Sequence, residues 1–530
     1  MSQTLRAEDH VEVEWQFEAG DLAAVGGWLG ERAPGSGITV TPDSTQEISD
    51  TYLDTDDWRF YRAGYVLRVR QREERAEATM KALASADSSS DGLKRREITE
   101  PLDRGVRALK KSRGPVGERL RALAGNRELR SLFEVRTRRQ LFELRRDGAP
   151  SGGALTGEVA LDESEIVPGN GKEPACLEHV EVEAGEAAGV EGFVDALREA
   201  LDLHPATASK FLTGLSAAGL SPDDEAPEFG PTAIDNSQSA GKVAFAILRR
   251  HFATMLTHES GVRLGEDPEE LHDMRVATRR LRSALKLYAE FLPKRAERYG
   301  RDLRYFANAL GEVRDLDVHL QRLEGEDDED RESLERVTAA LEQWRSEARR
   351  NMLEVLDSKR YERFVSDFTS TLRRGRSPSP TRSILEVAPE LIRRRYKKVR
   401  KTAEGLDADS PPEDLHDLRE KGRRLRYALE PLDGVYGKPA ERMIELLKEL
   451  QDNLGEHQDL VVAAGLLREL GAGGDLPPRI VFSMGSLAGQ YARKAAEMRF
   501  ALQESKPFCA LQEGKPWIKL HKAMKMRPGR

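Results

Sequence analysis

The chain has 530 residues and a net charge of −8, with 33% charged and 38% hydrophobic residues. This length is too great for one ordinary domain and predicts two or three. The charge content, together with the lack of any apolar run long enough to span a bilayer, excludes an ordinary membrane protein. Two widely separated cysteines indicate no disulfide framework, and the N-terminus lacks a signal-peptide pattern, so we expect a cytoplasmic protein.

Short alternating segments fill the first part of the chain, from residue 1 to about 215. In the first of them, VEVEWQF (11–17), hydrophobic side chains fall on one face, and two glutamates and a glutamine fall on the other. Similar segments follow, separated by turn-forming residues: GYVLRVRQR, ATMKAL, RREIT, FEVRTRRQLFEL, GEVALDES and EHVEVEA. Several short strands with turn signals between them predict an antiparallel sheet or barrel.

Composition changes after this part of the chain. Residues 217–241 are rich in Pro, Gly, Asp and Ser, as in an interdomain linker, and long helical periods with many Arg, Glu, Leu and Ala follow them. We therefore predict an α+β multidomain protein with a strand domain at 1–215, a linker at 216–241 and a helical domain at 242–504. The last segment, 505–530, is a basic tail that we expect to be poorly ordered.

The helical part contains an internal repeat. LHDMRVATRRLRSAL (271–285) matches LHDLREKGRRLRYAL (415–429), and LGEVRDLDV (310–318) matches LGEHQDLVV (454–462). Both matches have the same offset, 144 residues, as the pairs His272/His416 and Gly311/Gly455 show. Two matches in one register predict two related helical bundles, at about 242–372 and 384–504, packed about a pseudo-twofold axis.

Carboxylates and arginines dominate the polar faces of the predicted strands. Any single strand would fit a sheet that faces water with its charges paired across strands. Two Glu-x-Glu pairs, however, concentrate carboxylates of the kind that Mg²⁺ prefers, and arginine forks match phosphate oxygens. Inside a closed barrel these groups suit a polyphosphate chain with bound metal. The polar faces are Glu12/Glu14/Gln16, Arg68/Arg70/Arg72, Thr79/Lys81, Arg95/Glu97, Glu134/Arg136/Arg138, Glu158/Asp162 and Glu181/Glu183.

An ordered set of motifs in this part resembles the CYTH superfamily, the triphosphate tunnel metalloenzymes. The set comprises VEVEWQF, TYLDT, VLRVR, TMK, RREI, ALDE, EVE and SKF. The resemblance implies an eight-stranded antiparallel tunnel in which Mg²⁺ or Mn²⁺ assists hydrolysis of inorganic triphosphate or a related triphosphate. It implies Glu12, Glu14, Asp162, Glu181 and Glu183 as metal ligands; Arg68, Arg70, Lys81, Arg95, Arg136, Arg138 and Lys210 as substrate ligands; and Glu12, Glu14 and Lys81 as catalytic residues.

One position departs from the family pattern. The family motif is E-x-E-x-K, and the residue at its lysine position here is Gln16. Glutamine can donate a hydrogen bond but carries no charge, so phosphate binding or transition-state stabilisation should be weaker. A non-catalytic polyphosphate-binding scaffold and an adenylate cyclase-type activity therefore stand as alternatives to hydrolysis.

Basic residues form one stripe on a predicted helix in each repeat. His272, Arg275, Arg279 and Arg282 fall within an arc of about 80°. His416, Arg419, Arg423 and Arg426 repeat this arrangement, and Arg280 and Arg424 add charge nearby. A solvated basic face is the ordinary explanation, but recurrence in both copies favours a polyanion site. The stripes lack interleaved aromatic residues, which favours a bare phosphate chain over nucleic acid. Neither histidine has a Cys or His partner at the spacing of metal ligands, so a metal site is not expected here.

These helical motifs resemble the CHAD domain, the conserved-histidine α-helical domain. The resemblance covers roughly residues 242–504 and implies two four-helix bundles whose basic surface binds inorganic polyphosphate, with possible recruitment to polyphosphate granules. It makes the eight residues of the two stripes, together with Arg280 and Arg424, the expected ligands. Val276 and Ala277 become Glu420 and Lys421 in the second copy, so the stripes need not contribute equally. The oligomeric state is left open.

Overall fold

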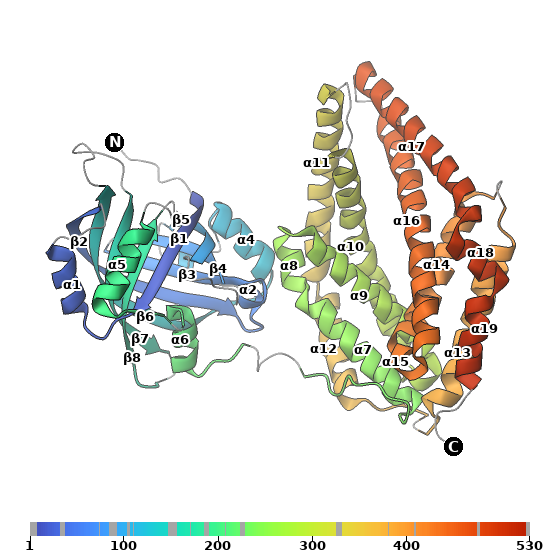
Figure 1. Ribbon diagram of the computed structural model, residues 1–530, viewed down its shortest axis with the longest axis horizontal. Coiled ribbons are helices and arrows are strands. Elements are labelled where there is room, and N and C mark those ends of the chain that lie inside the picture. The colour runs from blue at the N-terminus through green and yellow to red at the C-terminus, as the bar shows by residue number, and fades with distance from the viewer. Residues whose placement is uncertain are drawn as a thin grey trace. The chain divides into compact units, whose positions relative to one another are not determined.

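The computed structural model divides into two compact units, Met1–Ala226 and Pro227–Arg530 (Figure 1). It describes residues 8–31, 38–73, 75–83, 93–102, 106–109, 111–146, 156–169, 171–184, 190–206, 208–222, 228–324, 331–379, 381–407, 410–473 and 477–525.

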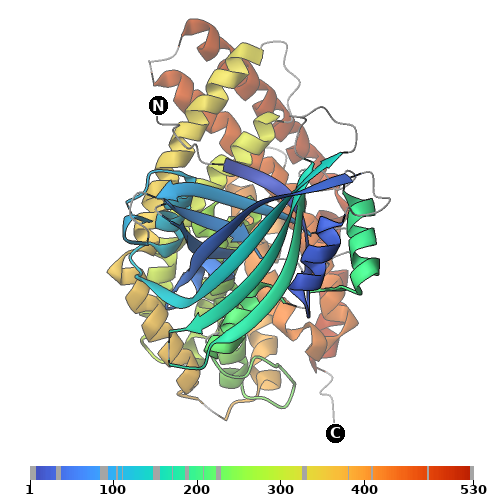
Figure 2. The same ribbon diagram turned by 90° about the vertical axis from the view of Figure 1, so that its left-hand side faces the viewer.

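The first unit is a closed antiparallel barrel. Its strands are β1 (Glu8–Glu18), β2 (Ile38–Thr55), β3 (Tyr65–Arg72), β4 (Arg75–Ala82), β5 (Leu93–Leu102), β6 (Leu129–Arg146), β7 (Gly157–Pro168) and β8 (Ala175–Ala184). They pair in the order β5-β4-β3-β2-β6-β7-β8-β1, and a β1–β5 pairing closes the ring (Figure 2). The predicted eight-stranded barrel is confirmed, with one small difference: a two-residue strand, β9 (His204–Pro205), also pairs with β1.

Packing on the outside of the barrel decides which strand faces point inward. Val13, Trp15 and Phe17 of β1 are buried beneath helices α1 (Leu22–Gly30) and α5 (Glu191–Leu201). Because side chains alternate along a strand, the glutamates of β1 must then face the barrel interior. Helix α2 (Arg59–Arg62) packs on β2 and β3, and α4 (Pro115–Ala124) packs on β4 and β5. The short helix α3 (Val106–Leu109) precedes α4 in the chain.

Helix α6 (Lys210–Ala218) packs at one end of the barrel. Its Phe211 contacts Tyr52 and Phe133, with ring centroids 5.7 and 6.1 Å apart, among inward-facing hydrophobic side chains. Gly214 faces the ring of Phe133, so the helix approaches the wall closely. This packing directs Lys210, the first residue of α6, into the barrel.

The second unit is helical, and its two repeats pack in the same order. Helices α7 (Ala240–Thr257), α9 (Pro268–Leu287), α10 (Ala296–Glu324) and α11 (Arg331–Leu356) correspond to α13 (Ile384–Glu404), α14 (Pro412–Leu429), α16 (Lys438–Ala472) and α17 (Pro478–Glu504). The unit also contains helices α8 (Glu259–Leu264), α12 (Lys359–Arg374) and α15 (Asp433–Tyr436), together with two helices at the C-terminal end, described next. Helices α9 and α14, which carry the basic stripes, contact each other.

The basic tail is partly ordered, contrary to expectation. Residues 506–525 form α18 (Lys506–Glu513) and α19 (Lys515–Lys525). Phe508, Leu511 and Leu520 join the main hydrophobic core of the helical unit, which explains why this lysine-rich segment folds.

None of the helices in the described ranges combines the length and the apolarity needed to cross a membrane.

Gly214→Ala should destabilise the barrel unit. A methyl group there would overlap the Phe133 ring, and overpacking of this kind costs about 1–3 kcal/mol. Gly192→Ala in α5, where a methyl group meets nothing within 4 Å, is the matched control and should not destabilise. Urea unfolding followed by amide hydrogen exchange in β6 measures the difference; equal stability of the two variants would contradict the packing of α6.

Candidate functional site

Three glutamates of the barrel interior lie close enough to hold one metal ion. Carboxylate oxygens of Glu14, Glu181 and Glu183 all lie within 4.8 Å of one another. The β1–β8 register brings them together, since Glu14 pairs with Glu183 and Gln16 with Glu181. Glu14 and Glu181 are only 3% and 5% exposed. Closely spaced carboxylate oxygens are the ligands that a hard divalent cation prefers, so these residues fit Mg²⁺ or Mn²⁺.

Gln16 lies within this acidic cluster. Its Nε2 donates to Oε1 of Glu14 at 2.6 Å and to Oε1 of Glu181 at 3.1 Å. The amide therefore links two of the three glutamates without adding positive charge.

Lys81 of β4 supplies a positive charge at the same place. Its Nζ lies 2.8 Å from Oε2 of Glu14 and 3.3 Å from Oε2 of Glu97. Burial on its own would lower the pKa of Lys81, but the charges of Glu14 and Glu97 raise it above its ordinary value. Lys81 is therefore protonated and lies between the acidic cluster and the arginines of β3.

Two arginines of β3 extend from the same wall of the barrel. Arg70 makes a bidentate pair with Asp50, with Nε–Oδ1 and Nη2–Oδ2 both at 2.8 Å. Arg68 lies 3.3 Å from Glu97 and 3.8 Å from Asp50. Burial would raise the pKa of Asp50, yet Arg70 and then Arg68 hold it well below the usual range.

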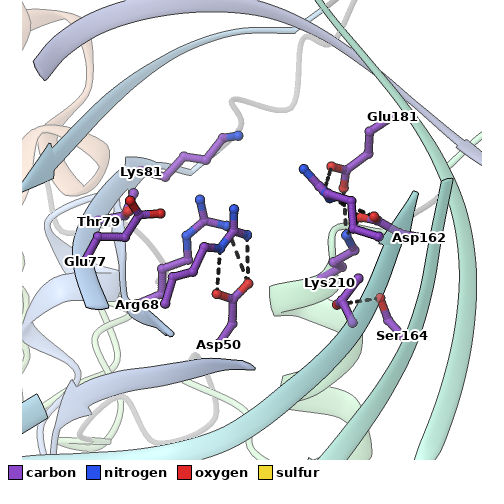
Figure 3. Close-up of polar contacts among 12 residues, drawn as sticks. Asp50, Arg68, Glu77, Thr79, Lys81, Asp162, Ser164, Glu181 and Lys210 are labelled. Carbon is purple, nitrogen blue, oxygen red and sulfur yellow. Dashed lines mark hydrogen bonds and ion pairs between the residues drawn. The ribbon is translucent and has the colours of Figure 1, made fainter. Parts of the chain in front are cut away.

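The opposite wall carries a second mixed cluster. Arg139 makes a bidentate pair with Asp162 at 2.7 and 2.6 Å, and also binds Glu181. Lys210 binds Asp162 and lies 2.9 Å from Glu181. Burial would raise the pKa of Glu181, but Lys210 and Arg139 hold it well below its ordinary value. Figure 3 shows Arg68 and Lys81 on one wall and Asp162, Glu181 and Lys210 on the other.

Most of the tunnel residues expected from the sequence therefore meet in the barrel. These are Glu14, Arg68, Arg70, Lys81, Asp162, Glu181, Glu183 and Lys210. Asp162 differs in role from expectation, because both of its oxygens bind Arg139 and it lies outside the glutamate cluster. Glu12 and Arg95 face each other in the β1–β5 register, but their side chains lie outside the described residues.

The expectation that Arg136 and Arg138 line the tunnel is wrong. Both are exposed on the outer face of β6, where Arg136 donates to Glu134 at 3.1 Å. Thr137 and Arg139 occupy the inward positions instead. The sequence analysis chose the wrong face of β6 because hydrophobic residues lie on both faces: Val135 on one and Phe142 on the other are both buried. Asp50 and Arg139 were thus missed; a correct parity for β6 would have found Arg139.

The helical unit brings arginines of both repeats together. Arg275 and Arg279 of α9 occupy the positions of Arg419 and Arg423 of α14 in the other copy. Burial lowers the pKa of Arg279, and the charges of Arg275 and Arg419 add to this shift. Burial and then the charge of Arg279 lower the pKa of Arg423 to about 9. Like charges that lower one another's pKa in this way favour a bound anion.

The two copies also build the same backbone contact. A methyl group on Gly311 of α10 would lie 3.6 Å from Nη2 of Arg275, and one on Gly455 of α16 would lie 3.5 Å from Nη2 of Arg419. Arg275 and Arg419 therefore each lie against the glycine of their own copy. This contact explains why the two repeat motifs are separated by the same distance in both copies. The histidines differ: His272 is half-buried, with a pKa lowered by burial and Arg314, and His416 is exposed.

Comparisons with known proteins match each unit separately. The family model described as CYTH domain matches residues 29–215, and the model described as CHAD domain matches residues 246–468. Two uncharacterized proteins, from two strains of Mycobacterium tuberculosis, are 29% identical over 250 residues, covering 44% of this chain and 47% of theirs. The chain thus spans about half the length of these curated relatives.

Solved structures resemble the two units as well. The CHAD domain of the plant Ricinus communis is 30% identical and covers 54% of this chain and 97% of its own, with a TM-score of 0.47. PptA from Streptomyces chartreusis is 19% identical and covers 51% of this chain and 99% of its own, with a TM-score of 0.42. A Hippeastrum protein named for adenylyl cyclase, and described as having a dominant triphosphatase activity, is 14% identical; it covers 40% of this chain and 96% of its own, with a TM-score of 0.28.

Acidification should weaken the barrel through Glu97. Burial would raise its pKa, but Arg68 and Lys81 lower it from 4.5 to about 2. Stability from these ion pairs is therefore complete above pH 4.5 and is lost as the pH falls toward 2; the shift of Asp50 has the same sign. Hydrogen exchange in β3 and β5 between pH 6 and 3 should show this loss.

A Glu97→Gln variant should show a shallower pH dependence, whereas Glu165→Gln, which changes an exposed residue on the outer face of β7, should not. The same slope in Glu97→Gln as in the unchanged chain would contradict the assignment.

Proposed function

Because this chain joins a CYTH domain to a CHAD domain, we propose that its barrel hydrolyses a triphosphate and its helical unit binds polyphosphate. The observation that carries the proposal is the convergence of two kinds of group inside one closed barrel. A glutamate cluster suited to Mg²⁺ or Mn²⁺ lies beside Lys81, and arginine–carboxylate pairs lie on both walls. Inorganic triphosphate is the simplest substrate that needs both.

The carboxylates behind the arginines position the remaining guanidinium donors. Arg70 uses Nε and Nη2 on Asp50, and Arg139 uses the same two nitrogens on Asp162, so Nη1 of each is left for a phosphate oxygen. The guanidinium planes are fixed before substrate arrives, which reduces the ordering cost of binding. Asp50 and Asp162 act on substrate through these arginines.

Hydrolysis needs charge stabilisation more than covalent chemistry, because phosphoryl transfer develops charge on oxygens. A divalent ion held by Glu14, Glu181 and Glu183 would neutralise phosphate charge and lower the pKa of bound water. Arg68, Arg70, Lys81 and Lys210 would hold the phosphate oxygens, and the enclosed interior would exclude bulk water and strengthen each contact.

Gln16 supports the rival proposal of a non-catalytic scaffold. It stands where the family pattern has a lysine, and its amide binds Glu14 and Glu181 without adding charge. Lys81 lies 2.8 Å from Glu14 and supplies a cation from another strand, which favours hydrolysis over the scaffold.

Phosphate release from tripolyphosphate with Mg²⁺ or Mn²⁺ tests hydrolysis. We expect turnover by the wild type and a loss of at least about a hundredfold in Glu14→Ala, since a catalytic metal ion contributes several kcal/mol. Glu165→Ala on the outer face is the control. Gln16→Lys should raise turnover or tighten substrate binding by returning the missing charge.

An inactive wild type that still binds polyphosphate would support the scaffold instead. Formation of cyclic AMP from ATP, detected by chromatography, would support the cyclase alternative.

Polyphosphate binding by the helical unit should depend on Arg279 and Arg419. Alanine at either position should weaken binding of inorganic polyphosphate and reduce the salt slope of log K by roughly 0.7 per lost contact. Arg393→Ala is a matched control, because this exposed arginine of α13 pairs with Glu390 away from the stripes. RNA should compete poorly at equal phosphate concentration; equal competition by RNA would contradict a preference for bare phosphate chains.

A further inference from the structure

The two basic stripes differ in how far carboxylates already neutralise them. Together the copies contribute eight arginines: Arg275, Arg279, Arg280 and Arg282 from α9, and Arg419, Arg423, Arg424 and Arg426 from α14. Two glutamates, both from the second copy, bind four of the eight. The two stripes are therefore similar in sequence but differ in how much positive charge is left to bind an anion.

Glu420 neutralises two arginines of the second copy, Arg423 and Arg424. It lies one helical turn before its partners on α14, where it binds Arg423 and lies 3.3 Å from Arg424. The equivalent residue of the first copy, 144 positions earlier, is Val276. The first stripe thus has no carboxylate at this position.

Glu430, which follows α14, binds one arginine from each copy. Its two oxygens lie 3.0 Å from Nη2 of Arg280 and 3.2 Å from Nη1 of Arg426. The ring of Tyr427 lies 5.3 Å from both guanidinium groups and holds them beside the carboxylate. The first copy has Lys286 in place of Glu430 and Ser283 in place of Tyr427, so this arrangement occurs once.

Three arginines of the stripes remain without a carboxylate at ion-pair distance within the described part of the chain: Arg279, Arg282 and Arg419. The Nε atoms of Arg279 and Arg419 are buried and lack a hydrogen-bond partner there, as do those of Arg280 and Arg426, so the difference between the two sets lies in the carboxylates of Glu420 and Glu430. The remaining arginine, Arg275, pairs with Asp315 at 2.8 Å. Uncompensated charge is therefore concentrated at Arg279 and its neighbours, next to the contact between α9 and α14.

We infer that Glu420 and Glu430 act as internal competitors of polyphosphate, so that the phosphate chain binds first at Arg279, Arg282 and Arg419. The inference rests on the proposed binding of polyphosphate by this unit. A phosphate chain reaches Arg280, Arg423, Arg424 and Arg426 only by displacing one of the two glutamates. The two glutamates of the second copy therefore lower the affinity of the surface, although its stripe contains the same number of arginines as the first.

Exchanging residues between the copies tests this directly. In the full chain, Glu420→Val and Glu430→Lys install the first-copy residues, and Val276→Glu installs the second-copy residue in the first stripe. Titration with inorganic polyphosphate at several salt concentrations should show binding roughly two- to fivefold tighter for Glu420→Val, in keeping with the strength of one exposed ion pair. Glu430→Lys should bind tighter still, with a steeper salt slope, and Val276→Glu should bind more weakly.

Glu404→Val is the matched control, because it removes the glutamate of an Arg400–Glu404 pair at the same i,i+4 spacing on α13. It should leave affinity nearly unchanged. Unchanged or weaker binding by Glu420→Val and Glu430→Lys, with normal thermal unfolding, would overturn the inference and make the glutamates positioning residues. Failure of the wild type to bind polyphosphate would instead overturn the proposed function of the helical unit.

Discussion

Closure of the sheet by the β1–β5 pairing forces charged groups from opposite walls into one enclosed space. A buried carboxylate or guanidinium group is costly unless an opposite charge accompanies it, so the interior must compensate its own charges. Asp50 with Arg70 and Asp162 with Arg139 do this through bidentate pairs. The glutamates around Gln16 lie beside Lys81, Arg139 and Lys210, and a divalent cation with its phosphate ligand would use their closely spaced carboxylate oxygens.

In the helical unit, positive charges repel one another on a half-buried surface. Internal symmetry brings equivalent arginines of α9 and α14 together, and the charge of Arg279 helps to lower the pKa of Arg423. Glu420 and Glu430 relieve part of this repulsion, and a polyanion could relieve the rest. Positive charge is therefore in surplus between the repeats, which suits a bare phosphate chain, whereas the barrel holds carboxylates and basic groups together, which suits phosphate with a bound metal.

Sequence patterns predicted the barrel and the helical repeats because both rest on strong periodicities. Alternation in VEVEWQF fixed the inward face of β1, since Trp15 and Phe17 had to be covered by helices. The same reasoning failed for β6 and chose the wrong face, because hydrophobic residues lie on both faces of this strand: Val135 packs at the end occupied by α6, and Phe142 packs outside. Ion pairing also could not be read from the sequence: Asp162 resembled a metal ligand, but the β6–β7 register places it opposite Arg139. The lysine-rich C-terminal segment folds because its sparse hydrophobic residues reach an existing core.

The account depends most on the glutamate cluster as a metal site. Electron paramagnetic resonance titration of Mn²⁺ into the full chain measures this directly, since free and bound Mn²⁺ give different signals. We expect Mn²⁺ to bind the wild type more tightly when tripolyphosphate is present, and this binding to be lost in Glu181→Gln but kept in Glu165→Gln. Equal Mn²⁺ binding by the wild type and Glu181→Gln, with no effect of tripolyphosphate, would contradict it.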